Sequence, residues 1–342
     1  AFTRGFRARV YPINRVASSA ANQDCLWVEG QNCAKKVDFA LGARAALTVR
    51  IDNSLTGFLF GRIKNVNLDL TPLSSTANLL RVEADPIDVP KIYAYVAKSE
   101  LSKYPKIVEY WKTRRQQLAA TDFTSNDTID TGPAPEWAMG DFQAFEELVK
   151  SGPLVTSIWR VGTQAGSGTG SKCFDDKSKL QGLVTTNAPT YLPNPPVFEN
   201  DELAYKVAGA HHLADGVTLF KGSYDLVLRS DFARCLYGFT SAPIRAKVSV
   251  VSTDGSTQDI ATESLREDAT RQWLYLSARN FTFSSPTIKV KLTQDAPAPQ
   301  ATAQATTKPA PIAKKSITCI KGKTTKKVTA TNPACPKGYK KK

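Results

Sequence analysis

The stretch Ile288-Lys289-Val290-Lys291-Leu292 alternates apolar and charged residues with a period of two. This is the pattern of a β-strand that buries one face and turns the other to water. Other short apolar runs precede it from residue 205 onward, separated by turn sequences such as Asp254-Gly255. Short strands at this spacing predict an antiparallel, Ig-like β-sandwich over residues 201–294. The runs that we expect to form its strands are 217–220, 224–228, 235–239, 246–251, 273–276 and 288–292.

The first 200 residues also indicate β-structure, together with two helices. Apolar runs bounded by turn residues predict strands at 45–51, 57–61, 79–84 and 91–96. A helix is predicted near 102–118, where Ser102 is a candidate N-cap and Pro105 falls in the first turn. A second helix is predicted near 141–150, with Asp141 as its N-cap. The expected fold class is therefore mainly β with a few helices.

Length and composition divide the chain into four parts. Its 342 residues exceed one typical domain, so we expect an N-terminal β-rich domain at 1–200 and the sandwich domain at 201–294. Residues 295–311 are mostly Ala, Pro, Thr and Gln, which predicts an extended linker. Residues 312–342 form a basic tail with its own pair of cysteines.

The basic character of the chain is concentrated in this tail. The formal net charge is +14, and the segment 296–342 contains eleven Lys and no Asp, Glu or Arg. Subtracting 11 from 14 leaves +3 for the first 295 residues. A polyanionic partner is therefore expected at the tail, either an anionic cell-wall polymer or an identical or neighbouring surface subunit. The candidate polyanion-binding residues are Lys314, Lys315, Lys321, Lys323, Lys326, Lys327, Lys337, Lys340, Lys341 and Lys342.

We expect no nucleic-acid partner and no membrane-spanning segment. The run Lys112-Thr113-Arg114-Arg115 is basic, but it is short and has no interleaved aromatic side chains, which is more typical of a solvated helix face. No apolar stretch approaches the roughly 20 residues that a membrane-spanning helix needs.

The cysteines favour disulfides over metal ligation. There are six of them, no two are spaced as CxxC, and the chain has only two histidines. Six cysteines allow several connectivities. Proximity in the sequence suggests the pairs Cys25–Cys33, Cys173–Cys235 and Cys319–Cys335. Disulfides are typical of oxidising compartments.

The first residues agree with an extracellular location. The chain begins Ala1-Phe2-Thr3-Arg4, without an initiator Met, and contains a single Met, Met139. A small first residue is expected where a signal peptide has been removed, although a chain trimmed for another reason would look the same.

Two segments of the tail form a recognisable motif. They are Ser316-Ile317-Thr318-Cys319-Ile320-Lys321-Gly322-Lys323 and Asn332-Pro333-Ala334-Cys335-Pro336-Lys337-Gly338-Tyr339. The motif resembles a tail found on many exported actinobacterial surface proteins. The blocks 25–33, 178–187, 205–213 and 233–239 are similar to a group of uncharacterised exported actinobacterial proteins. The resemblance covers most of the chain and implies location at the cell surface. It implies no activity.

The sequence offers no clear catalytic or cofactor motif. Only His211 and His212 can serve as histidine bases, and no Gly-x-Ser-x-Gly surrounds a candidate nucleophile. The glycine-rich run 166–172 lacks the Gly-Lys-Ser/Thr order of a phosphate-binding loop. We therefore expect no catalytic residue, no cofactor and no metal site, although carboxylate pairs such as Glu146-Glu147 keep hydrolysis open.

Three functions remain open from the sequence. The first is a non-enzymatic structural or assembly protein of the cell envelope, held by its tail. The second is an extracellular glycan- or ligand-binding module, for which Trp137 and Trp159 are the candidate ligand-binding residues. The third is a secreted hydrolase.

Overall fold

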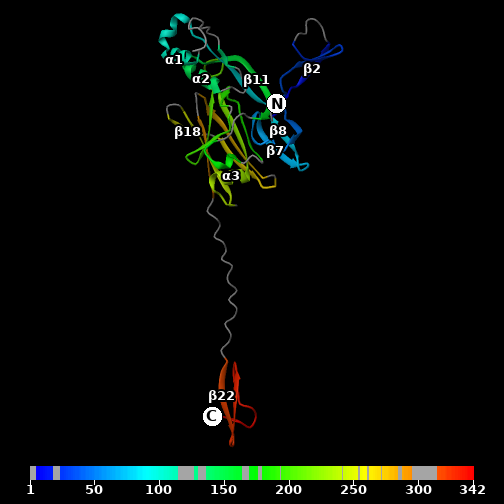
Figure 1. Ribbon diagram of the computed structural model, residues 1–342, viewed down its shortest axis with the longest axis vertical. Helices are drawn as coiled ribbons and strands as arrows, with labels where there is room; N and C mark the ends of the chain where they lie inside the picture. Colours follow the sequence, from blue (N-terminus) through cyan, green and yellow to red (C-terminus); the bar gives the residue numbers. More distant parts are fainter. Residues whose placement is uncertain are drawn as a thin grey trace. The chain divides into compact units, whose positions relative to one another are not determined.

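The computed structural model describes residues 5–17, 24–114, 127–129, 136–163, 169–175, 179–192, 194–240, 242–252, 255–259, 262–270, 272–283, 287–294 and 314–342. Strands dominate these residues, so the predicted class, mainly β with a few helices, is confirmed. The chain divides into two compact units, Ala1–Asp295 and Ala296–Lys342, which we call the body and the tail (Figure 1). The predicted linker, 295–311, lies outside the described residues.

The body is built around one large sheet, the central sheet. Within the described residues it contains β10 (Asp127–Ile129), β9 (Ile87–Ala94), β11 (Lys150–Thr163), β6 (Gly57–Arg62), β12 (Leu180–Thr186), β16 (Lys221–Arg229), β20 (Trp273–Thr282) and β19 (Thr262–Asp268), in that order, with β1 (Arg7–Val10) paired to β11. Most neighbours are antiparallel, but β12 pairs with β6 in parallel.

A second sheet, the facing sheet, covers one side of the central sheet. Its described strands are β13 (Thr190–Tyr191), β15 (Glu202–Ala208), β21 (Thr287–Gln294), β17 (Ile244–Val251) and β18 (Thr257–Asp259), with β14 (Val197–Glu199) paired to β15. Side chains from both sheets form one core, including Phe58, Leu226 and Leu276 from the central sheet and Tyr205 and Val290 from the facing sheet. The two sheets therefore pack as a β-sandwich.

A third sheet, the flank sheet, covers the opposite side. Among the described residues it consists of β5 (Ala45–Asp52), β8 (Ala77–Asp85) and β7 (Lys64–Pro72), in that order. Its apolar residues, such as Leu68 and Val82, share a second core with Leu59 and Trp273 of the central sheet. The central sheet is thus buried on both faces, because Phe58 and Phe60 of β6 point into the first core while Leu59 points into the second.

This arrangement corrects the predicted boundary at residue 200. The strand β6 comes from the first part of the chain and β16 from the second, yet both pair with β12 within one sheet. The body is consequently one compact unit from residue 1 to 295. The boundary between the two units follows residue 295, close to the predicted end of the sandwich domain at residue 294. An Ig-like strand order stays a prediction.

The helices differ from their predicted bounds. The short 3-10 helix η1 (Lys98–Lys103) precedes α1 (Pro105–Arg114), so Ser102 is not the N-cap and Pro105 takes the first position of α1, where it suits a helix start. The second helix, α2 (Glu136–Phe145), begins before the predicted start and places Asp141 inside the helix, 4% exposed. The 3-10 turn η2 (Glu146–Leu148) follows it.

Two of the predicted strands in the sandwich are wrong. Residues 235–238 fall in α3 (Ser230–Tyr237) and its C-cap, Gly238, whose φ of 65° ends the helix, and Phe239 follows outside any strand. Phe232, Ala233 and Leu236 are buried and have the spacing of one helix face. This spacing indicates a helix, but the apolar run 235–239 by itself predicts a strand. Residues 217–220 make only an isolated bridge, in which Leu219 pairs with His212.

Near the N-terminus lies a small sheet, the arm sheet, whose described strands pair with no strand of the other sheets. Its described strands are β2 (Ile13–Ala17), β4 (Asn32–Lys36) and β3 (Cys25–Glu29), in that order. It lies at the margin of the body, beside the label β2 in Figure 1. Cys33 and Ala34 are buried in it, whereas Trp27 and Val28 are each 52% exposed.

Candidate polyanion-binding surface

The tail folds as a small antiparallel sheet, the tail sheet. Its described strands are β22 (Lys315–Lys321), β23 (Thr324–Ala330) and β24 (Lys340–Lys341), and β22 lies in the middle. A two-residue turn joins β22 to β23, since Lys321 pairs with Thr324. Gly322 has a φ of 63° there, which glycine adopts without steric cost. Sequence therefore specifies the hairpin locally.

A disulfide takes the place of a core in this sheet. Cys319 joins Cys335, with their Cα atoms 5.7 Å apart, and Cys319 is the one buried residue between 314 and 342. A sheet this small is marginal in water without further support. The cross-link therefore holds the tail together while leaving its other side chains free for the surface.

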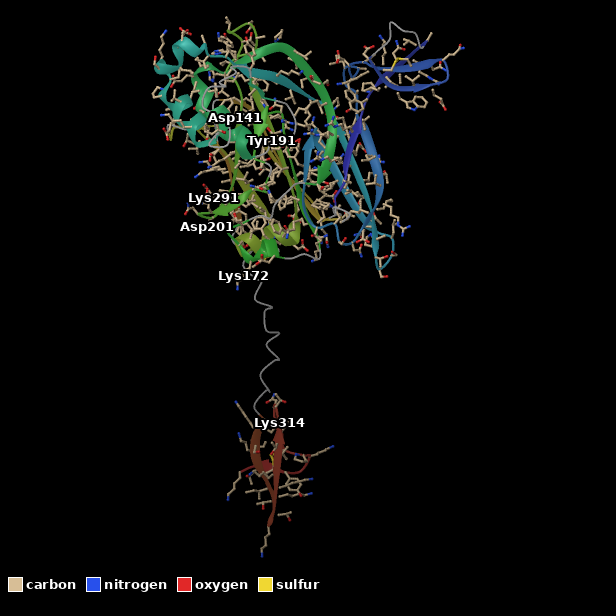
Figure 2. The ribbon with its side chains drawn as sticks, turned by 45° about the horizontal axis from the view of Figure 1, so that its top comes forward. Asp141, Lys172, Tyr191, Asp201, Lys291 and Lys314 are labelled. Carbon is tan, nitrogen blue, oxygen red and sulfur yellow. A yellow bond between two sulfur atoms is a disulfide. The ribbon has the colours of Figure 1, made fainter. Side chains whose placement is uncertain are left out.

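All ten predicted lysines are exposed. The strand register places Lys326 and Lys341 on either side of Cys319 on one face, and puts Lys327 and Lys340 on the other face. Figure 2 shows the side chains spreading outward from the tail sheet on both sides, Lys314 among them. Since the segment contains no Asp, Glu or Arg, none of these charges is neutralised by an acidic side chain of the tail.

This distribution suits a chain of repeated anionic groups better than a single small anion. Lysine ammonium groups are point charges on flexible stems and lack the planar fork with which arginine clamps one carboxylate or phosphate. Charges on two faces can follow a polymer that bends around the sheet. Such contacts are exposed, so salt screens them strongly.

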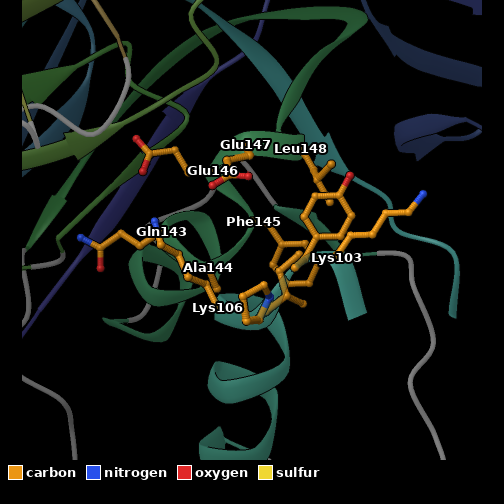
Figure 3. A pocket seen from close by; sticks show the side chains of 11 residues that line it. Lys103, Lys106, Gln143, Ala144, Phe145, Glu146, Glu147 and Leu148 are labelled. Carbon is orange, nitrogen blue, oxygen red and sulfur yellow. The ribbon is translucent and has the colours of Figure 1, made fainter. Parts of the chain in front are cut away.

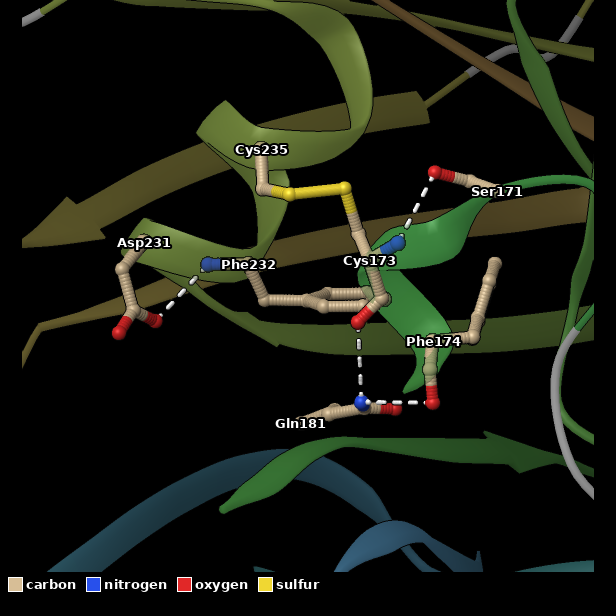
Figure 4. Close-up of a disulfide and its surroundings, with 7 residues drawn as sticks. All are labelled: Ser171, Cys173, Phe174, Gln181, Asp231, Phe232 and Cys235. Atoms are coloured by element: carbon tan, nitrogen blue, oxygen red, sulfur yellow. Dashed lines mark hydrogen bonds between the residues drawn. A yellow bond between two sulfur atoms is a disulfide. The ribbon is translucent and has the colours of Figure 1, made fainter. Parts of the chain in front are cut away.

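The other two predicted disulfides also form. Cys25 joins Cys33 in the arm sheet, and Cys173 joins Cys235 in the body. The latter connects η3 (Lys172–Asp175) to α3, beside the edge-to-face rings of Phe174 and Phe232 (Figure 4). The side-chain amide of Gln181 donates to the carbonyl oxygens of Cys173 and Phe174, at 3.2 and 3.3 Å. This disulfide thus stabilises the end of the sandwich.

Of the two tryptophans predicted to bind a ligand, the structure describes the side chain of Trp159. Trp159 is 1% exposed and belongs to the second core, where its indole N–H donates to the carbonyl oxygen of Ala84 at 2.9 Å. The prediction for Trp159 is therefore wrong, because its ring is closed off from solvent. Trp137 lies in α2, and its side chain is outside the described residues.

The histidines are engaged in local structure. His211 Nδ1 lies 2.7 Å from the carbonyl oxygen of Phe283, and the rings of His211 and His212 contact edge to face at 4.7 Å. The carboxylate of nearby Asp215 accepts backbone N–H bonds from Val217 and Thr218, closing a turn. Within the described part of the chain, no cluster of His, Cys, Asp or Glu could hold a metal ion.

Two concave regions of the body are candidate sites for a ligand or a substrate. A pocket of about 180 Å³ lies between α1 and η2, with Lys103, Lys106, Glu146 and Glu147 on its wall (Figure 3). It is smaller than the roughly 300 Å³ at which ligand sites usually begin. A wider cleft of about 500 Å³ is lined by Lys64, Asp88, Lys221, Arg279, Phe220 and Leu213.

Sequence reasoning overlooked a set of arginines in the central sheet. Arg9, Arg62 and Arg160 lie on three different strands but come together in the fold. Their distances along the chain follow no motif. The only signal in the sequence is a charged residue at the end of an otherwise buried strand, as Arg62 is in Phe58-Leu59-Phe60-Gly61-Arg62.

Comparisons of the chain with protein-family models, with curated proteins and with solved structures return no match. Among the residues that the structure describes, no helix combines the length and apolarity needed to cross a membrane.

Proposed function

We propose that this chain is a non-enzymatic structural or assembly protein of the cell envelope, and that its tail binds an anionic wall polymer. The observation that carries the proposal is the tail sheet itself. It exposes ten lysines, contains no acidic side chain and is held by a disulfide instead of a core. A surface of one charge sign attracts polyanions.

Two further features support export to the cell surface. Three disulfides are typical of an oxidising compartment. The tail sequence resembles tails of exported actinobacterial surface proteins. A neighbouring subunit with an acidic surface is the other partner that the same charges would fit.

The experiment compares binding of matched variants to isolated cell walls. We expect the full chain to sediment with walls at low salt and to be released at about 1 M salt, where the screening length is about 3 Å. Deletion of 296–342, or replacement of the ten lysines by Gln, should abolish retention. Replacement of the same lysines by Arg should preserve it, since the charge is kept. Unchanged retention of the Gln variant at low salt would contradict the proposal.

The wider cleft of the body favours a second candidate function, binding of a glycan or another extracellular ligand. Lys64 and Lys221 line it, and among the described residues neither has a carboxylate partner. Binding of a soluble wall fragment that survives deletion of the tail and is lost in Lys64→Gln and Lys221→Gln would support this function.

A further inference from the structure

A row of arginines crosses three neighbouring strands of the central sheet. Arg9 of β1 lies directly opposite Arg160 of β11, and Arg160 lies directly opposite Arg62 of β6. Residues opposite one another in antiparallel pairs point to the same face, so the three side chains share one side of the sheet. Arg7, two residues before Arg9, is on that side too. The row runs from the exposed Arg7 and Arg9 into the body.

Arg62 forms the inner end of the row. It is fully buried, and its guanidinium donates to the carbonyl oxygens of Thr186, Ala188 and Pro189. It also stacks on the ring of Tyr191, 4.6 Å from the centroid. Burial, and to a lesser extent the charge of Arg160, lower the pKa of Arg62 to about 10, so the group stays charged at neutral pH.

Arg160 stands between this buried charge and solvent. Only 6% of the residue is exposed, and its one side-chain hydrogen bond among the described residues is a long one of 3.4 Å, from Nη2 to the Tyr191 hydroxyl. Burial lowers the pKa of Arg160, and the charges of Arg9 and Arg7 lower it further. Tyr191, labelled in Figure 2, is buried in the body, with 1% of the residue exposed.

The row differs from several other arginines of the body, which have a carboxylate partner. Arg234 pairs with Glu267, and Arg279 pairs with Asp225. Within the described residues, no carboxylate forms an ion pair with Arg7, Arg9, Arg62 or Arg160. Like charges directly opposite one another on a sheet repel, and buried charges normally have a partner.

We propose that this arginine row binds an oxyanion, a carboxylate or phosphate group supplied from outside the chain. Arginine presents a planar set of N–H donors that matches both groups, and Arg9 and Arg160 offer such donors next to each other. Tyr191 adds a hydroxyl at the same place. The site lies in the body, so it is separate from the lysines of the tail and goes beyond the proposed function.

The test measures thermal unfolding of the full chain in phosphate, acetate or chloride at equal ionic strength. Tryptophan fluorescence reports the body alone, because all five tryptophans precede residue 296. We expect millimolar phosphate or acetate to raise the midpoint with saturation, and chloride to leave it unchanged. A response to both anions indicates a general oxyanion site, and a response to one identifies the group.

Arg9→Gln is the decisive variant, because Arg9 is exposed and its loss should leave the fold intact. It should weaken the apparent affinity for the anion about tenfold, the usual effect of losing one charged hydrogen bond. Arg160→Gln should abolish the response. Arg50→Gln removes an exposed arginine of β5 and serves as the matched control. Equal midpoints in all three salts, or equal responses of Arg9→Gln and Arg50→Gln, would overturn the proposal.

Discussion

The arm sheet and the tail sheet have the same construction but differ in the chemistry of their exposed side chains, which are apolar in the arm and cationic in the tail. In the described residues each has three antiparallel strands and one disulfide, closing separations of 8 and 16 residues respectively. Each buries very little, Cys33 and Ala34 in the arm and Cys319 in the tail. The exposed residues differ, however. In the arm sheet about half of the surface of each of four apolar residues is exposed, namely Ile13, Leu26, Trp27 and Val28, whereas the tail sheet exposes lysines.

The comparison indicates what a disulfide does for a small sheet. A domain of this size cannot bury enough apolar surface to fold on that basis alone, so small exported units commonly rely on cross-links. Once the cross-link supplies stability, the remaining side chains are not needed for a core. Their chemistry can then be selected for contact with a partner, apolar in one sheet and cationic in the other.

Removal of the two cross-links should give the largest effects. The chain-entropy account gives about 3 kcal/mol for the 16-residue separation of Cys319 and Cys335. We expect Cys319→Ala with Cys335→Ala to unfold the tail sheet. Cys25→Ala with Cys33→Ala should destabilise the arm sheet by roughly 2.5 kcal/mol, since its separation is only 8 residues. Amide hydrogen exchange, resolved by residue, measures both.

The body provides the control for these two variants. Its cores contain no residue of the tail, so its thermal unfolding midpoint should not change when the tail cross-link is removed. Retention of slow exchange in β22 and β23 after loss of both tail cysteines would show that the tail does not depend on its disulfide.

Truncation of an exposed arm side chain should have a smaller effect. Trp27 faces Ala34 across β3 and β4 and is 52% exposed. We expect Trp27→Ser to reduce the stability of the arm sheet by about 1 kcal/mol, the contribution of one cross-strand pair. Thr325→Ser in the tail is a matched exposed control with little effect. Loss of the whole arm sheet in Trp27→Ser would show that Trp27 supplies a core after all.

Acid should produce the smallest difference between the two sheets. The hydrogen bond from Lys35 lowers the pKa of Asp24 below its ordinary 3.8, and the two groups lie 2.9 Å apart. A lowered pKa means that the ion pair stabilises the arm above pH 3.8 and is lost as the pH falls through the lowered value. The tail has no Asp or Glu. Between pH 5 and pH 2.5, the protection of backbone amides, measured relative to the intrinsic exchange rate at each pH, should therefore fall slightly around Asp24 and Lys35, an effect that Asp24→Asn removes. An equal fall in protection in the tail would contradict this.

The features that sequence predicted well are local ones. Each cysteine pairs with its neighbour in the order of cysteines along the chain, over 8 and 16 residues in the two small sheets and over 62 residues between Cys173 and Cys235. The alternation in β21 reports one buried face, and Ile288, Val290 and Leu292 are indeed buried there. The lysines of the tail are exposed because a segment without acidic or apolar residues has little to bury them.

The tertiary structure alone decided which strands lie in the centre and which distant residues meet. A strand such as β6 is buried on both faces by two different sheets, so its sequence loses the period of two and gives no sign of the second layer. The same packing joins strands from both sides of residue 200, and it brings Arg9, Arg62 and Arg160 into one row across more than 100 residues of chain. A local pattern records burial of one face over a few residues, whereas pairing between distant strands depends on how the whole body packs.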